Sequence, residues 1–349
     1  MLLNDTGLAL VQNRPIPERD AMPVRESIRM SLAINWSTRL QAVSVPLPGL
    51  SPYTSARRLS VEGRFDQTLM CDFLTARHPH ISIDIWERAA TEGRLTIDGQ
   101  LVRDLKRNVR AGNVISHVVK NVVEPAVSTD MRLLHEDDRY IAIDKPAPLP
   151  VHPSGRYNRH TVVSFLKAMY PDLAFKPVHR LDADTTGVLL LARTKESANT
   201  AGQYFRNKHF SKIYLARVHG RWAGGSRLIE QAIGKSPVAK GARALESSNG
   251  LPSETAVELL QYFEEDNSSL LKVMPTTGRT NQIRLHLASC GHAIMGDHAY
   301  GQPSDASDSN RPFTSGFLCL HAHKLILSAR NDDPGLDLES PLPDWALIA

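Results

Sequence analysis

Six consecutive glycine, alanine and aliphatic residues, 187–192, form the segment that most constrains how this chain folds. A short apolar run bounded by a turn is typical of a strand buried on both faces. The preceding residues, His179-Arg180-Leu181-Asp182, place a base, a cation and a carboxylate just before that strand. We therefore expect Asp182 to lie on a loop at the mouth of a sheet, anchored by a rigid core element.

Asp182 is the first candidate catalytic residue. A neighbouring arginine favours the ionised form of a carboxyl group, and an ionised aspartate can act as a nucleophile. The same segment also fits a charged surface loop in front of a strand. From these residues alone, the two interpretations have about equal weight.

Length and composition set broad limits. A chain of 349 residues favours two domains. The net charge of +4 and the pI near 8.9 are compatible with nucleic acid but do not identify it as the partner. Three widely spaced cysteines without a C-x-x-C pair predict reduced cytoplasmic thiols rather than disulfides or a zinc ribbon. No apolar run reaches the roughly 18 residues of a membrane helix, so we expect no membrane association.

We expect four regions along the chain. Residues 1–55 are rich in Pro, Ser and Arg and predict a partly irregular extension. Residues 56–122 predict a small α/β module, in which Ser82 caps a helix and 93–99 forms a strand and turn. Residues 123–335 hold the chemistry, and 336–349 form a tail.

Strand candidates joined by short turns dominate the third region and predict an α+β fold with a mixed, largely antiparallel sheet. The expected strands are 140–145, 187–192, 212–220, 254–262, 270–274 and 317–327, and the expected helices are 161–170 and 195–207.

The small module contains a cationic segment, residues 103–110. Its cations are Arg103, Lys106, Arg107 and Arg110. On composition, contact with RNA phosphates and a solvated surface loop are equally good interpretations.

A second segment with chemical potential is 275–286. Gly278 allows a sharp exit from a strand, and Thr280 or Asn281 can cap the helix that follows. Arg284 would project from the flank of that helix's first turn, where it is either a surface cation or a bidentate partner for a carboxylate. Tyr214, on the strand candidate 212–218, is either core packing or an aromatic surface for a base.

Together these segments resemble three motifs of the RluA-type pseudouridine synthases. Residues 179–188 are similar to H-R-L-D-x-x-T-S-G-L, with Thr186 for Ser. Residues 277–286 are similar to T-G-R-T-H-Q-L-R-x-H, with Asn281 for His and Ile283 for Leu, and residues 212–216 to K-x-Y-x-A. The resemblance implies the pseudouridine synthase fold, and the order of elements in 56–122 resembles a small RNA-binding module found in many synthases.

The same resemblance implies roles for individual residues. Asp182 would be the catalytic carboxylate, Arg284 its ion-pair partner, and Tyr214 the residue that stacks on the target base. Arg180 would fill the gap left by an extruded base. His179, Arg279 and Gln282, which lie inside the motifs, would contact RNA. The isomerisation would need no cofactor.

Residues 150–162 resemble the P-V-H-P-x-G-R-Y-x-x-x-T-V segment of a subgroup that includes eukaryotic tRNA pseudouridine-32 synthases. Arg156, Tyr157 and Arg159 would grip phosphates and stack a base. The resemblance favours a tRNA anticodon stem-loop as substrate, with large-subunit ribosomal RNA as the alternative. A non-catalytic RNA-binding protein or chaperone on the same fold is the rival of another class. We expect RNA as partner and no obligate protein partner.

No metal site is predicted. His292, His298, His321 and His323 lack an acid or cysteine at a recognisable ligand spacing, and the H-x-E and P-C-x-x-C pattern of zinc deaminases is absent.

Overall fold

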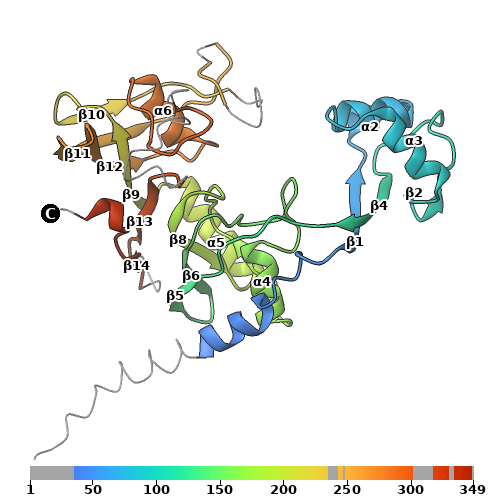
Figure 1. Cartoon of the computed structure of the whole chain (residues 1–349), viewed down its shortest axis with the longest axis horizontal. Coiled ribbons are helices and arrows are strands. Elements are labelled where there is room, and N and C mark those ends of the chain that lie inside the picture. Colours follow the sequence, from blue (N-terminus) through green and yellow to red (C-terminus); the bar gives the residue numbers. More distant parts are fainter. Residues whose placement is uncertain (1–34, 235–242, 247, 302–316, 330–333, 348–349) are drawn as a thin grey trace, which may run out of the picture.

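The computed structural model describes residues 35–234, 243–246, 248–301, 317–329 and 334–347. Two separate sheets organise these residues, one of four strands and one of ten. Figure 1 shows the four-stranded module at one end of the molecule, joined to the larger body through the roots of strands β1 (Tyr53–Ser60) and β4 (Val114–Val122). Residues 1–34 of the expected extension lie outside the described residues.

The module is a small α/β unit with its own core. Its sheet has the order β1-β4-β2-β3, with all neighbours antiparallel. The elements are β1 (Tyr53–Ser60), η1 (Gly63–Phe65), α2 (Met70–Arg77), α3 (Ile83–Thr91), β2 (Leu95–Ile97), β3 (Gln100–Leu101) and β4 (Val114–Val122). Trp86 of α3 packs with Phe73 of α2 and Leu95 of β2 in a single apolar cluster.

The helix α3 lies where the sequence predicts it but differs in detail. Ser82 precedes the first helical residue, yet its side chain makes no capping hydrogen bond. Ile85 is 40% exposed, whereas Trp86 is buried. The strand and turn predicted at 93–99 are confirmed, because β2 is followed by a turn at Asp98 and Gly99.

The body is an α+β unit built on the ten-stranded sheet, as predicted. Its main path is β10-β11-β12-β9-β13-β8-β6-β5, with β14 beside β13 and β7 beside β8. The strands are β5 (Arg132–Glu136), β6 (Tyr140–Lys145), β7 (Lys176–Pro177), β8 (Thr186–Ala192), β9 (Phe210–His219), β10 (Ser226–Ile229), β11 (Thr255–Phe263), β12 (Ser268–Pro275), β13 (Leu320–Leu327) and β14 (Leu336–Glu339). The helices are α4 (Val162–Met169), α5 (Lys195–Arg206) and α6 (Gln282–Ser289), and η4 (Asp344–Ala346) follows β14.

In the interior of the sheet, β8 and β13 make a short parallel contact, whereas the other neighbouring strands of the described residues run antiparallel. Gly187 faces Ala322 there with a φ of +106°, and a Cβ atom on Gly187 would lie 2.2 Å from the Ala322 carbonyl oxygen. Only glycine fits this approach. Residues 188–192 are buried, which confirms the strand predicted from the apolar run. The chain therefore enters the sheet centre directly from the Asp182 loop.

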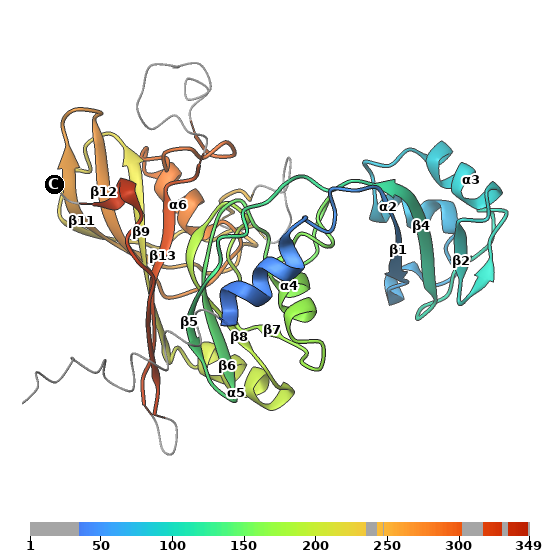
Figure 2. The same cartoon turned by 60° about the horizontal axis from the view of Figure 1, so that its bottom comes forward.

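Segments near both ends of the described chain also join the body. Residues 35–44 form a helix beside α4 (Figures 1 and 2). Trp36 and Leu40 of this helix lie in the main core, and Trp36 Nε1 donates to the Met131 carbonyl at 2.8 Å. Residues 336–339, expected to be part of a tail, form β14 against β13.

Glu124 lies at the joint between module and body. This buried carboxylate accepts hydrogen bonds from the backbone N–H groups of Asn158, Arg159 and His160 and from the Tyr53 hydroxyl. The loop before α4 is thus tied to the roots of β1 and β4.

Candidate active site

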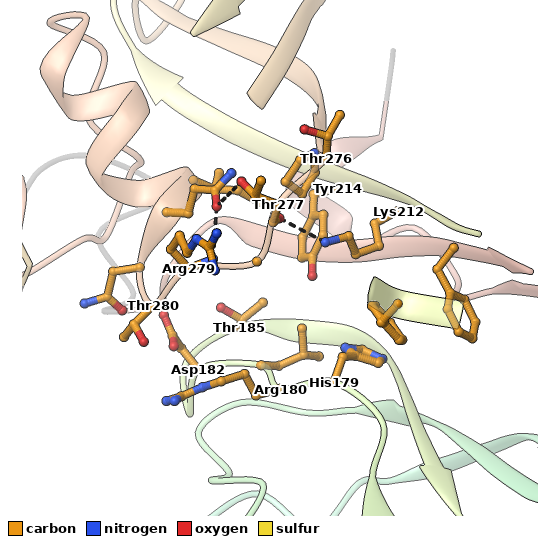
Figure 3. A pocket seen from close by; sticks show the side chains of 18 of the residues that line it. His179, Arg180, Asp182, Thr185, Lys212, Tyr214, Thr276, Thr277, Arg279 and Thr280 are labelled. Atoms are coloured by element: carbon orange, nitrogen blue, oxygen red, sulfur yellow. Dashed lines mark hydrogen bonds between the residues drawn. The ribbon is translucent and has the colours of Figure 1, made fainter. Parts of the chain in front are cut away.

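Three segments far apart in sequence surround a cavity of about 510 Å³. They are the loop 178–185 before β8, residues 205–214 from the end of α5 into β9, and residues 275–284 from β12 into α6. All three motifs recognised in the sequence therefore meet at one place. Figure 3 shows Asp182 and Tyr214 facing this space from opposite sides.

Asp182 is paired with Arg284. The Arg284 Nη1 atom lies 3.2 Å from Asp182 Oδ2, and both side chains are largely buried. Arg284 also donates two hydrogen bonds of 2.7 Å, from Nε and Nη2, to the carboxylate of Asp297. The guanidinium thus bridges one carboxylate at the cavity and a second one behind it.

Asp297 fixes the bridging arginine, a role that the sequence did not suggest. Its side chain is fully buried, and its Oδ1 also accepts from the backbone N–H groups of Ala299 and Tyr300. Burial raises the pKa of Asp297, but the Arg284 guanidinium outweighs it, so the carboxyl pKa lies below its usual value. Burial would lower the pKa of Arg284, but hydrogen bonding to Asp297 and the charge of Asp182 raise it. Both groups therefore stay ionised.

Asn281 does not cap α6 through its side chain, contrary to expectation. It adopts a left-handed conformation with a φ of 56° and makes no capping hydrogen bond. Its amide instead donates to the Tyr300 hydroxyl at 3.2 Å and accepts weakly from Arg284 at 3.4 Å. The residue therefore helps to enclose the guanidinium.

Tyr214 and Lys212 enter the cavity from β9. Because side chains alternate along a strand, residues two apart lie on the same face. Tyr214 is 8% exposed, and its burial, with the charge of Asp182, raises the pKa of the phenol, so the hydroxyl stays protonated. Lys212 Nζ donates to the Thr277 carbonyl at 3.0 Å, and burial lowers the pKa of this amine to about 8. Lys212 is not among the predicted site residues, although its spacing from Tyr214 already indicates the cavity side of the strand.

Gln282 serves the protein rather than presenting a free amide to RNA. Its Oε1 accepts from Thr277 Oγ1 and the Arg279 N–H, and its Nε2 donates to the Glu254 carbonyl and Thr255 Oγ1. These four hydrogen bonds use the whole hydrogen-bonding capacity of the side chain. The expected RNA contact through this amide is therefore replaced by a structural one.

His179 likewise has a structural environment, in contrast to the expected RNA contact. Its Nε2 atom accepts from the Leu190 N–H at 3.1 Å, which ties the loop to β8. Burial lowers the pKa of the imidazole to about 3, so it is neutral and offers no charge to a phosphate. Arg180 and Arg279 do line the cavity; Arg180 is exposed, and Arg279 Nε donates to the Pro252 carbonyl.

The other predicted RNA contacts lie outside the cavity. Arg156 is exposed on the loop before α4, Tyr157 beside it is half-buried, and Arg159 stacks over the Tyr53 ring at 3.7 Å. The four module cations, Arg103, Lys106, Arg107 and Arg110, are all exposed.

Within the described residues, no group of three or more His, Cys, Asp or Glu side chains is placed to hold a metal ion. None of the helices described has the length and apolar character of a membrane span.

Comparison with known proteins agrees with this geometry. Residues 139–289 match the model of the RNA pseudouridylate synthase family. An uncharacterized RNA pseudouridine synthase of Synechocystis is 34% identical over 269 residues, which are 74% of this chain and 91% of the relative. Ribosomal large subunit pseudouridine synthase D of Nitrosomonas europaea is 38% identical over 63% of this chain and 64% of its own length.

Two further similarities come from eukaryotes. The mitochondrial tRNA pseudouridine(32) synthase of Saccharomyces cerevisiae is 28% identical over 73% of this chain and 55% of its own length. The solved structure of human RNA pseudouridylate synthase domain containing 1 superimposes with a TM-score of 0.52 at 27% identity, covering 63% of this chain and 87% of that one.

Proposed function

Since this chain belongs to the RluA-type pseudouridine synthases and is therefore an enzyme that isomerises uridine in RNA, we propose that Asp182, Tyr214 and Arg284 form its catalytic set. The observation that carries the assignment is the pairing of Asp182 with Arg284 at 3.2 Å, across 102 residues of sequence, at the edge of the cavity.

In the proposed reaction, Asp182 attacks the ribose of an extruded uridine and the bond between uracil and ribose breaks. The uracil turns in place, and its C5 atom bonds to the ribose C1′ as the C1′–O bond to Asp182 breaks and returns its electron pair to the carboxylate. C5 then passes its proton to water. Arg284, clamped by Asp297, keeps the nucleophile aimed, and the Tyr214 ring packs against the base. The raised phenol pKa makes Tyr214 a hydrogen-bond donor rather than an anion at neutral pH.

Extrusion of the base is assigned to Arg180. This side chain is exposed at the cavity mouth, two residues before Asp182, and is not used in any hydrogen bond among the described residues. Extruding a stacked base costs a few kcal/mol, and a planar guanidinium in the vacated place offsets part of it. Arg279, on the opposite lip, would contact the RNA backbone.

We propose a tRNA anticodon stem-loop as substrate, with position 32 as target. Two observations support this: residues 150–162 resemble the subgroup that acts there, and the yeast relative is named for position 32. Arg156, Tyr157 and Arg159 would hold the loop, and the module cations would contact phosphates further along the RNA. Large-subunit ribosomal RNA is the second candidate, favoured by the 38% identity to a ribosomal synthase.

Mapping pseudouridine at single-nucleotide resolution separates the two substrates. The purified enzyme would be incubated with a tRNA transcript carrying uridine 32 and with a ribosomal RNA fragment. Modification of the transcript at position 32 supports our proposal, and modification of the ribosomal fragment alone overturns the tRNA assignment.

We propose the cytoplasm as the compartment, on the ground that the three cysteines are free thiols.

A further inference from the structure

Lys212 is a largely enclosed cavity cation to which the proposed reaction gives no task. It lies on β9 two residues before Tyr214, on the same face of the strand. Figure 3 shows its amine at the cavity edge, hydrogen-bonded to Thr277.

The surroundings of Lys212 leave part of its amine unused. A lysine amine carries three donors, and one of them goes to the Thr277 carbonyl at 3.0 Å. Within the described part of the chain, no carboxylate forms an ion pair with Lys212, although its side chain is mostly enclosed. Burying a cation without a counter-charge is costly, and this explains the lowered pKa of about 8. Such a group is best explained by an anionic partner that arrives with the substrate.

The reaction creates an anion in the cavity. When the C1′–N1 bond breaks, its electron pair stays on the uracil, whose negative charge spreads over N1 and the carbonyl oxygens. When C5 bonds to C1′, an electron pair of the uracil anion forms the new bond, while the C1′–O bond to Asp182 breaks and returns its pair to the carboxylate. The C5 proton then passes to water, which restores the ring. The detached uracil therefore needs a cation for the time between the two bonds.

The other cations around the cavity are less suited to this task. Arg284 is committed to Asp297 and Asp182, and Arg279 Nε is bonded to the Pro252 carbonyl. Arg180, Arg206 and Lys208 are exposed at the rim. The remaining titratable groups that face Lys212 are the neutral His179, the protonated Tyr214 and the carboxylate Asp182.

We propose that the Lys212 amine donates a hydrogen bond to a carbonyl oxygen of the target uracil and stabilises the anionic base while it is detached from the ribose. A donor preorganised toward developing charge in an enclosed site typically contributes a factor of about 10²–10³ to the rate. This inference rests on the proposed function of the same cavity.

The alternative is that Lys212 only holds the turn that contains Thr277. That turn has other anchors: Thr277 Oγ1 donates to Gln282 Oε1 at 2.8 Å and accepts from the Glu254 N–H at 3.0 Å. Thr277→Val removes these anchors and keeps the carbonyl that Lys212 contacts. It is therefore a control that loosens the turn without removing the cation.

The test is the single-turnover rate at saturating RNA, measured from pH 6 to 9.5. The substrate is the RNA that the wild-type enzyme modifies, either the tRNA transcript or the ribosomal fragment. We expect Lys212→Met to slow the chemical step by about 10²–10³-fold with little change in RNA affinity. We expect the wild-type rate to fall above about pH 8, as Lys212 loses its proton. Lys212→Arg should keep a larger share of the rate and move this fall to higher pH, because arginine stays charged. In Thr277→Val, the rate should fall at the same pH as in the wild type.

Two results would overturn the proposal: a Lys212→Met rate within about threefold of wild type, or a fall at the same pH in Lys212→Arg. Asp182→Ala, measured in parallel, separates this inference from the proposed function. If Asp182→Ala is active, the assignment of the whole site fails. If it is inactive while Lys212→Met has the full rate, only the role of Lys212 fails.

Discussion

The cavity in the body and the small module both gather cations, but they hold them differently. Arg284 is 14% exposed and bridges two carboxylates, one of which is fully buried. The four cations of residues 103–110 are exposed, and none of them forms an ion pair with another described residue. Enclosed charges are fixed in direction and little affected by salt, whereas exposed charges act over a distance and are screened. The cavity is therefore suited to chemistry and the module to affinity.

The largest effect should follow from breaking the buried ion pair between Asp297 and Arg284, here called the clamp. We expect Asp297→Asn to cost about 3–5 kcal/mol of stability, because it leaves the Arg284 charge buried with one carboxylate fewer. We also expect it to slow isomerisation, because Arg284 no longer holds Asp182 in position. Chemical denaturation and single-turnover rates would measure both. Asp266→Asn, which breaks the Arg217–Asp266 pair away from the cavity, is the matched control and should lower stability with a much smaller effect on the chemical step.

The same clamp predicts a dependence of stability on pH. The folded-state pKa of Asp297 lies below its usual value, so the unfolded state binds the proton more readily. Its contribution to stability is therefore complete above about pH 4 and disappears as the pH falls through the folded pKa. Unfolding midpoints between pH 2 and 6 should fall less steeply for Asp297→Asn than for wild type. Identical slopes would show that the clamp does not carry this charge.

A middle-sized effect should come from the module. Replacing Arg103, Lys106, Arg107 and Arg110 by Gln should weaken RNA binding and lower the slope of log K against log salt by roughly 0.7–0.9 for each phosphate that is no longer neutralised. The chemical rate at saturating RNA should stay the same. Four exposed cations of the body, Arg132, Lys167, Arg221 and Arg227, provide a control of equal charge. An equal decrease of affinity in the control would mean that net charge, not the module surface, governs binding.

The smallest effect should come from the rim of the cavity. The cations there are exposed, like those of the module, but they line the opening of the catalytic cavity. Arg206 and Lys208 line the opening, are exposed, and form no ion pair with the described residues. Arg206→Gln with Lys208→Gln should lower the salt slope by about 0.7 per residue if both touch the RNA strand next to the target. A drop in the chemical rate at saturating RNA, with the salt slope unchanged, would instead show that Arg206 and Lys208 act in the chemical step, as the enclosed residues of the cavity do.

Local patterns predicted the strands and helices that bear the site, whereas long-range pairings left no sign in the sequence. The apolar run before Ala192 is a strand wherever it packs, so β8 was predictable, and the same holds for the helix that carries Arg284. By contrast, Asp297 lies in a short turn whose sequence does not indicate that its carboxylate is buried against Arg284. The amide of Gln282 is used up by Glu254 and Thr255, which are 27 or more residues away.

Segments outside the motifs show the same limit. β14 has four residues and is stable only because β13 offers an edge to pair with, which a single short segment does not reveal. Lys212 is different, since strand alternation with Tyr214 already places it on the cavity side. What the alternation does not reveal is that no carboxylate of the described residues forms an ion pair with the enclosed amine, because that depends on segments more than 60 residues away, such as the turn at Thr277.

The proposed reaction depends above all on Asp182. The most direct measurement is pseudouridine formation by Asp182→Asn at saturating RNA, with RNA affinity measured on the same samples. Asp184→Asn, an exposed aspartate two residues further on, is the control. We predict no detectable product from Asp182→Asn with RNA affinity largely retained, and near wild-type product from Asp184→Asn. Appreciable turnover by Asp182→Asn would contradict the assignment of the nucleophile and, with it, the role given to this cavity.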